Sequence, residues 1–201
     1  MRTILITIGL IFLSLLSHSQ TNDSAKVIRK TFDTYDELRN MQKEEEIDIL
    51  TYLDSTFNYQ VQIPNWLNLK ETGMTYAWGG TLPAVEMIEN AIMITAYEKK
   101  EYKSFMDFRK YIVEDLVFGK PTSWSDSHIF YGKKELGKYK NIGYAYKVYW
   151  IYQNLMYHCK YILVETETAY LWIQFISTPE TFEKNIDKFE EFMNGFKITN
   201  F

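Results

Sequence analysis

Side chains suited to nucleophilic catalysis are few in this chain. Cys159 is the single cysteine, and His128 and His158 are the only histidines beyond residue 19. A Ser–His–Asp mechanism needs a histidine that a carboxylate orients. Asp126 lies two positions before His128, where an Asx-type turn explains the pattern equally well. His158 adjoins Cys159, but adjacent residues of a strand point to opposite faces. The sequence therefore predicts no catalytic residue.

Cys159 itself falls on the apolar face of a predicted strand, together with Tyr157 and Tyr161. A cysteine in such a position is typical of a small buried core residue. The alternative is an intermolecular disulfide, because a single cysteine in an exported protein has no internal partner.

Motifs for metals, nucleotides and paired carboxylates are also missing from the sequence. Zinc sites need three or four ligands, usually at short spacing, and neither H-x-x-x-H nor C-x-x-C occurs. Neither G-x-x-x-x-G-K-[ST] nor G-x-G-x-x-G is present to hold a phosphate. Glu165 and Glu167 flank a predicted hairpin turn, where carboxylates are typically solvated rather than an acid–base pair. We expect no metal and no cofactor.

Aromatic residues are the one positive signal, with 13 Phe, 16 Tyr and 5 Trp. Trp66, Trp78 and Trp124 lie near predicted loops or strand ends. The run from Trp78 to Pro83 is predicted to be a loop, in which Gly79 and Gly80 let the backbone approach a ligand closely. Trp78 beside them offers a flat apolar contact. These three residues are the candidate ligand-binding site; the alternative is that Trp78 caps the core and the glycines only shape a turn.

The N-terminus has the layout of a cleavable signal peptide. Arg2 precedes an apolar run, and Ser17 and Ser19 lie three and one positions before a predicted cut ahead of Gln20. The apolar run is shorter than the ~20 residues of a membrane-spanning helix. The sequence predicts a signal peptide over residues 1–19 and a secreted or periplasmic protein with no later transmembrane segment. An uncleaved N-terminal anchor is the alternative.

The remaining chain fits one domain plus a charged extension. The net charge of −4 argues against a nucleic-acid partner, which would need a basic stripe. Residues 20–46 are polar and charged, with Ile28, Phe32, Tyr35 and Leu38 at roughly helical spacing. We expect a helix there, capped by Asp23, with a partly ordered arm as the alternative, and a single α+β domain over residues 47–201.

Alternating and turn-forming residues predict the elements of that domain. Short strands are expected over 57–63, 67–70, 74–78 and 91–97, and a helix over 101–118 that Gly119 and Pro121 end. Three long antiparallel strands are expected over 144–152, 155–165 and 169–176, separated by short turns.

The last helix is predicted from its ends as well as its apolar stripe. Thr178 can cap it, Pro179 suits its first position, and Gly195 can end it. Phe182, Phe189 and neighbouring apolar residues recur at spacings of three and four.

The strand at 170–176 predicts the architecture. It is apolar on both faces, whereas an antiparallel sheet with one wet face should alternate apolar and polar residues. Helices on both faces would cover it, giving a three-layer α/β/α sandwich.

Two segments resemble PsbP-like domains. The strand Tyr59–Ile63 followed by Pro64 resembles the beginning of such a domain. The run Phe175–Glu180, which leads into an amphipathic helix before Phe196, resembles its end. The resemblance covers about residues 57–198 and implies an antiparallel sheet between helices. It implies no function, because this fold hosts unrelated roles.

Three functional hypotheses remain open at this stage. The first is an exported, non-enzymatic domain that binds a protein partner or small ligand in the cell envelope. The second is an envelope hydrolase that uses carboxylates no motif reveals. The third is an assembly factor that docks through its N-terminal segment. The absence of catalytic motifs favours the first.

Overall fold

The computed structural model describes residues 29–44, 49–71, 74 and 76–199. The predicted signal peptide, its cut before Gln20, and the proposed cap Asp23 lie outside these residues. The elements are, in chain order, β1 (Arg29–Phe32), α2 (Tyr35–Glu44), β2 (Ile49–Asp54), β3 (Tyr59–Ile63), β4 (Asn68–Lys70), β5 (Ala77–Thr81), β6 (Ala91–Glu98), the 3₁₀ turn η1 (Lys99–Glu101), α3 (Phe105–Arg109), the π-helical turn η2 (Lys110–Glu114), β7 (Pro121–Thr122), β8 (Ser125–Tyr139), β9 (Gly143–Tyr152), β10 (Leu155–Glu165), β11 (Ala169–Ser177), α4 (Pro179–Asn194) and β12 (Phe196–Ile198).

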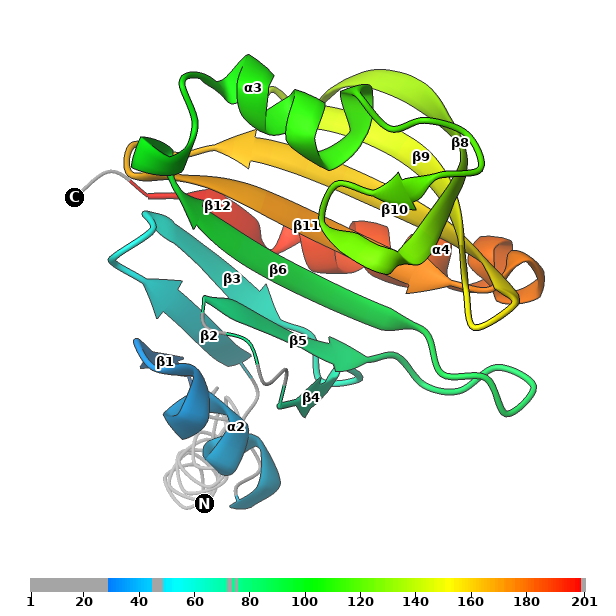
Figure 1. The fold of residues 1–201 in the computed structure, drawn as a ribbon. Helices are drawn as coiled ribbons and strands as arrows, with labels where there is room; N and C mark the ends of the chain where they lie inside the picture. The colour runs from blue at the N-terminus through cyan, green and yellow to red at the C-terminus, as the bar shows by residue number, and fades with distance from the viewer. Residues whose placement is uncertain (1–28, 45–48, 72–73, 75, 200–201) are drawn as a thin grey trace, which may run out of the picture.

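Two sheets form the centre of the molecule (Figure 1). The larger has eight strands in the order β4-β5-β6-β11-β10-β9-β8-β7, all paired antiparallel. The smaller has the order β1-β2-β3-β12, and its β1–β2 pair is parallel. Helix α2 provides the crossover that a parallel pair requires. The sequence did not predict this second sheet.

Each face of the large sheet has its own hydrophobic core. Strand β11 contributes Leu171 and Phe175 to one core, with α4 and the small sheet, and Tyr170 and Trp172 to the other, with α3 and η2. Nearly every residue of β11 is buried. The α+β fold class, with a mainly antiparallel sheet between helices, is therefore confirmed; the layer that holds α4 also contains the small sheet (Figure 1).

The long strands and the last helix begin and end close to the predicted positions. Gln153 and Asn154 both have positive φ, of 50° and 64°, as the two-residue turn between β9 and β10 requires. In α4, Pro179 occupies the first turn, but the Thr178 hydroxyl pairs with the Thr181 hydroxyl at 3.1 Å instead of a backbone amide. Gly195 ends the helix as predicted, with a φ of −81°.

The helix predicted over 101–118 is shorter than expected. Its α-helical part begins at Phe105, because the Ser104 hydroxyl accepts a hydrogen bond from the Asp107 amide and caps the first turn. The π-helical turn η2 then continues it to Glu114. Phe118, expected near its end, instead lies on the surface with 64% of its area exposed.

The charged N-terminal segment is not one helix. Residues 29–32 form strand β1, in which Phe32 pairs with Tyr52 of β2, and the helix starts only at Tyr35. Tyr35 and Leu38 do share a helix face as predicted, but Phe32 reaches the same core from a strand. Hydrogen bonds to β2, which a local pattern cannot reveal, decide this difference.

The predicted loop from Trp78 to Pro83 is wrong up to Thr81, because Trp78, Gly79 and Gly80 lie within strand β5, which ends at Thr81. A side chain at Gly79 would place its Cβ 2.2 Å from the Ile92 carbonyl oxygen, and one at Gly80 would come within 2.6 Å of the Asn68 oxygen. Here the glycines permit close packing of neighbouring strands and do not bend the chain.

Candidate functional site

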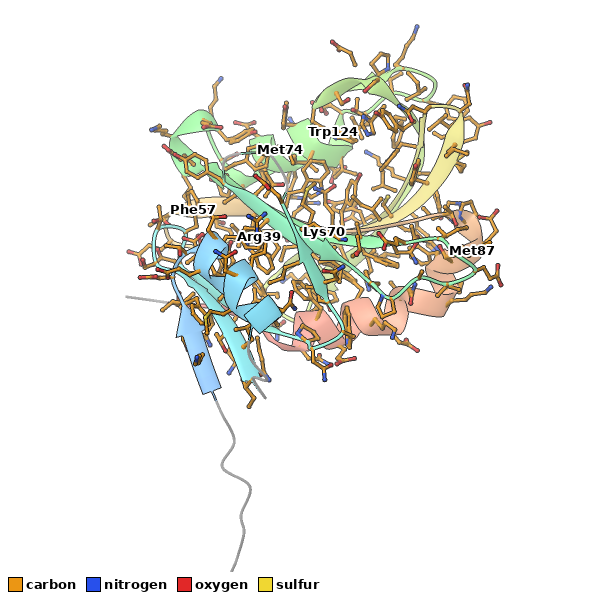
Figure 2. All side chains as sticks on the ribbon, turned by 90° about the horizontal axis from the view of Figure 1, so that it is seen from below. Arg39, Phe57, Lys70, Met74, Met87 and Trp124 are labelled. Carbon is orange, nitrogen blue, oxygen red and sulfur yellow. The ribbon has the colours of Figure 1, made fainter. Side chains whose placement is uncertain are left out.

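A hollow of about 420 Å³ lies where helix α2 meets strands β2 and β5. Arg39 on α2 and Phe57, in the turn before β3, lie on this side of the molecule (Figure 2). The volume is within the range of small-molecule sites. The residues that line the hollow are Asp33, Thr34, Tyr35, Asp36, Tyr52, Asp54, Thr56, Phe57, Tyr59, Glu71, Met74, Tyr76, Ala77 and Trp78.

Aromatic rings form the inner wall of the hollow. The Trp78 ring lies 5.2 Å from that of Tyr52 and 5.8 Å from that of Tyr35, measured between centroids. The Trp78 indole donates a hydrogen bond of 2.7 Å to the Tyr59 hydroxyl, which is fully enclosed. Burial, followed by the charge of Asp54, raises the pKa of both Tyr52 and Tyr59, so both phenols stay neutral at physiological pH. The wall is mostly buried and uncharged.

Helix α2 is fixed over the hollow by contacts to the edge of the large sheet. The Tyr35 hydroxyl lies 2.6 Å from the Gly79 carbonyl oxygen and 2.5 Å from that of Lys70. The Gln42 amide group donates to the Leu67 carbonyl at 2.6 Å and accepts from the Leu69 amide at 3.1 Å. Gln42 thus pairs with edge strand β4 as another strand would, which protects an edge that could otherwise aggregate.

Carboxylates surround the mouth of the hollow. Asp54 accepts hydrogen bonds from the Phe57 amide at 2.9 Å and from the Tyr52 hydroxyl at 3.2 Å, so its position is fixed. Arg39 lies between Glu71, at 3.1 Å, and Asp36, at 3.7 Å. Of the fourteen described residues that line the hollow, four carry carboxylates and none carries a basic side chain.

The structure places the three candidate residues differently from one another. Trp78 lines the hollow but is only 3% exposed, so its main contacts are with the core. Gly79 contributes its carbonyl to Tyr35, and Gly80 packs against β4 outside the lining. The acids and tyrosines of the hollow come from segments about twenty residues apart, and no sequence motif joins them.

The residues considered for catalysis occupy separate places. Cys159 is fully buried and burial raises the pKa of its thiol, which confirms the predicted core position. His158 lies on the opposite face, 4.7 Å from the Tyr149 ring. His128 has its Nδ1 2.6 Å from the Ser125 hydroxyl and its ring stacked on Tyr152. Among the residues that the structure describes, no three His, Cys, Asp or Glu side chains gather closely enough to hold a metal ion.

The structure also shows the surroundings of the two carboxylates in the hairpin after β10. Glu165 forms an ion pair of 2.9 Å with Lys99, and Glu167 is exposed. Glu165 lines a hollow of about 430 Å³ beside Phe105 and Tyr144, and Glu167 does not line it, so the structure does not place the two carboxylates together around one site.

A second polar cluster lies beneath η2, on the other side of the large sheet. Arg109 has a side chain only 9% exposed and contacts Glu114 at 2.9 Å. The Tyr146 hydroxyl accepts from Arg109 Nε at 2.9 Å and donates to Glu114 at 2.6 Å. The guanidinium also lies 3.9 Å from the Tyr144 ring centre. These contacts connect α3 and η2 to β9, and the polar groups of the cluster find their partners within the protein.

No protein-family model and no curated protein matches this chain. Solved structures do match parts of this chain. A Pseudomonas aeruginosa protein of unknown function matches 72% of this chain and 93% of its own, with 14% identity and a TM-score of 0.44. The cyanobacterial PsbP protein of Synechocystis, CyanoP, matches 75% of this chain and 92% of its own, with 9% identity and a TM-score of 0.45. A Bacteroides thetaiotaomicron structure matches 75% of this chain but 48% of its own, with 11% identity and a TM-score of 0.41.

These TM-scores indicate a weak similarity of fold. The predicted resemblance to PsbP-like domains is therefore supported only as a weak similarity of fold. Across the described ranges, every helix is too short or too polar to traverse a bilayer.

Proposed function

We propose that this chain is an exported, non-enzymatic domain of the cell envelope that binds a small ligand, or a side chain of a protein partner, in the hollow beneath α2. The observation that carries the proposal is the combination of a concave space, an aromatic wall and a few charged groups at its mouth. Small-molecule sites typically have this composition. Export is inferred from Arg2 and the apolar run that follows it.

The two partly buried carboxylates Glu114 and Glu190 do not support the alternative of an envelope hydrolase. A general acid needs a carboxyl group whose pKa is raised towards neutrality. Burial alone would raise the pKa of Glu114 and of Glu190, yet hydrogen bonds to Glu114 from Tyr146 and Lys133, and to Glu190 from Lys160 and Tyr139, hold both below the ordinary value. A lowered pKa is typical of a carboxylate in a structural ion pair and not of a general acid.

Filling the hollow should abolish ligand binding without unfolding the protein. Thr56 is exposed and lines the hollow, whereas its neighbour Ser55 is also exposed and does not line it. We expect a screen of small organic compounds, followed by amide NMR, to give shifts centred on Tyr52 and the Trp78 indole. Thr56→Trp should remove these shifts, and Ser55→Trp should retain them. Shifts that cluster elsewhere, or persist unchanged in Thr56→Trp, would refute the hollow as the site.

Export predicts the mass of the mature protein. When the full chain is expressed with its own N-terminus in a Gram-negative host, we expect the protein in the periplasmic fraction, starting at or near Gln20. Intact-mass analysis measures this directly. A protein that keeps residues 1–19, or stays in the cytoplasmic fraction, would contradict the export proposal.

A further inference from the structure

The charge around the hollow is one-sided. Asp33, Asp36, Asp54 and Glu71 all line it, and Arg39 is the neighbouring cation in contact with two of them. The single positive charge of Arg39 offsets the four carboxylates only in part, and none of the described residues that line the hollow is basic. A concave site with one sign of charge and low-dielectric walls concentrates the opposite ion. The hollow therefore attracts cations and repels anions.

The wall of the hollow suits an organic cation better than a metal ion. Tyr35, Tyr52 and Trp78 are in mutual contact, with ring planes inclined at 36° to 79°. Aromatic faces attract an ammonium group, most strongly when it is weakly hydrated and partly removed from water. A metal ion would instead need several converging oxygen ligands, and the described carboxylates do not converge in that way. The space also exceeds what one bare ion fills.

We propose that the hollow binds an organic ammonium group, held against the ring wall formed by Tyr35, Tyr52 and Trp78 and balanced by the carboxylates of Asp54 and Asp33. This inference rests on the proposed function and names its ligand class. Asp54 is the better fixed of the two acids, because the Phe57 amide and the Tyr52 hydroxyl hold its two oxygens.

A pair of nearly isosteric probes isolates the charge. Choline carries a trimethylammonium group, and 3,3-dimethylbutan-1-ol has the same shape with a neutral carbon in place of nitrogen. By NMR titration at low salt, we expect choline to bind at least ~10-fold more tightly than the alcohol, and its affinity to fall as salt is added. A capped Gly-Lys-Gly peptide, titrated in parallel, distinguishes a free cation from a lysine side chain of a partner; binding by either supports the proposal.

Variants that change one charge provide the control. Asp54→Asn keeps an acceptor for the Phe57 amide, so the turn should stay folded, and we expect choline affinity to fall roughly 3–10-fold. Asp33→Asn should act in the same direction, whereas Asp126→Asn, an exposed residue outside the lining, should leave affinity unchanged. Equal binding of the alcohol and choline, or no effect of either hollow variant, would overturn the cation proposal while leaving the hollow as a ligand site. If no compound perturbs the hollow at all, the proposed function fails with it.

Discussion

Replacing Trp78 by alanine should lower the free energy of unfolding by about 3–5 kcal/mol, as for other buried tryptophans. The side chain is 3% exposed and touches the rings of Tyr35, Tyr52 and Phe192. Its loss would also leave the enclosed Tyr59 hydroxyl without the indole donor. For a chain of this length, the change corresponds to a melting temperature lower by roughly 6–20 °C.

Two further variants define what that measurement means. Trp78→Phe keeps most of the ring and loses the N–H donor, so it should cost only about 1–2 kcal/mol. Phe118→Ala removes a ring that is 64% exposed and should stay within about 0.5 kcal/mol of the parent. A melting temperature that hardly moves in Trp78→Ala would show that the residue is a surface contact after all. The expected loss of stability would instead show that Trp78 is a core residue that supports the inner wall of the hollow.

Replacing Arg109 by methionine should be similarly damaging, at about 3–5 kcal/mol, because one partner of a buried ion pair is removed. Glu114 and Tyr146 would both lose their contact with the guanidinium, and Tyr144 would lose the cation that lies over its ring. Methionine keeps much of the volume, so the effect reports the polar contacts. Arg39→Met is the matched control: its ion pairs are with exposed carboxylates, and surface pairs contribute about 0–1 kcal/mol.

The pH dependence of the Arg109 variant provides a second test. Burial alone would raise the pKa of Glu114, but the hydrogen bond from Tyr146 and the charge of Lys133 outweigh burial and hold this pKa below its ordinary value. Such a group stabilises the fold above its unfolded pKa, and this stabilisation is lost as pH falls through the folded pKa. Loss of Arg109 raises the folded pKa. The difference in unfolding free energy between parent and variant, from urea denaturation, should therefore be larger at about pH 7 than at about pH 3. A constant or growing difference towards acid would exclude this role of Glu114.

The hollow itself could not be predicted, although one of its residues was. The sequence singled out Trp78 because two glycines follow it. In the structure these glycines allow close packing of neighbouring strands and do not form a loop. Asp54 and Tyr52 lie in β2, a segment for which the sequence predicted no element. They meet Trp78 only because β2 and β5, from different sheets, both pack against α2 and the same core. Spatial proximity of this kind leaves no trace in local spacing.

The sequence by itself determined the elements whose signals are local. Strands β9, β10 and β11 follow from their composition and short turns, and α4 follows from its apolar stripe between Pro179 and Gly195. Apolar residues on both faces of β11 required a covered sheet, because exposed apolar surface on either face would be unfavourable. Tertiary structure alone decided that residues 29–32 form a strand, since that strand exists through its hydrogen bonds to β2. It also decided that α2 bridges the two sheets, through Gln42 on edge strand β4 and Tyr35 on Gly79. Contacts between distant segments set both outcomes, and the hollow is where those segments meet.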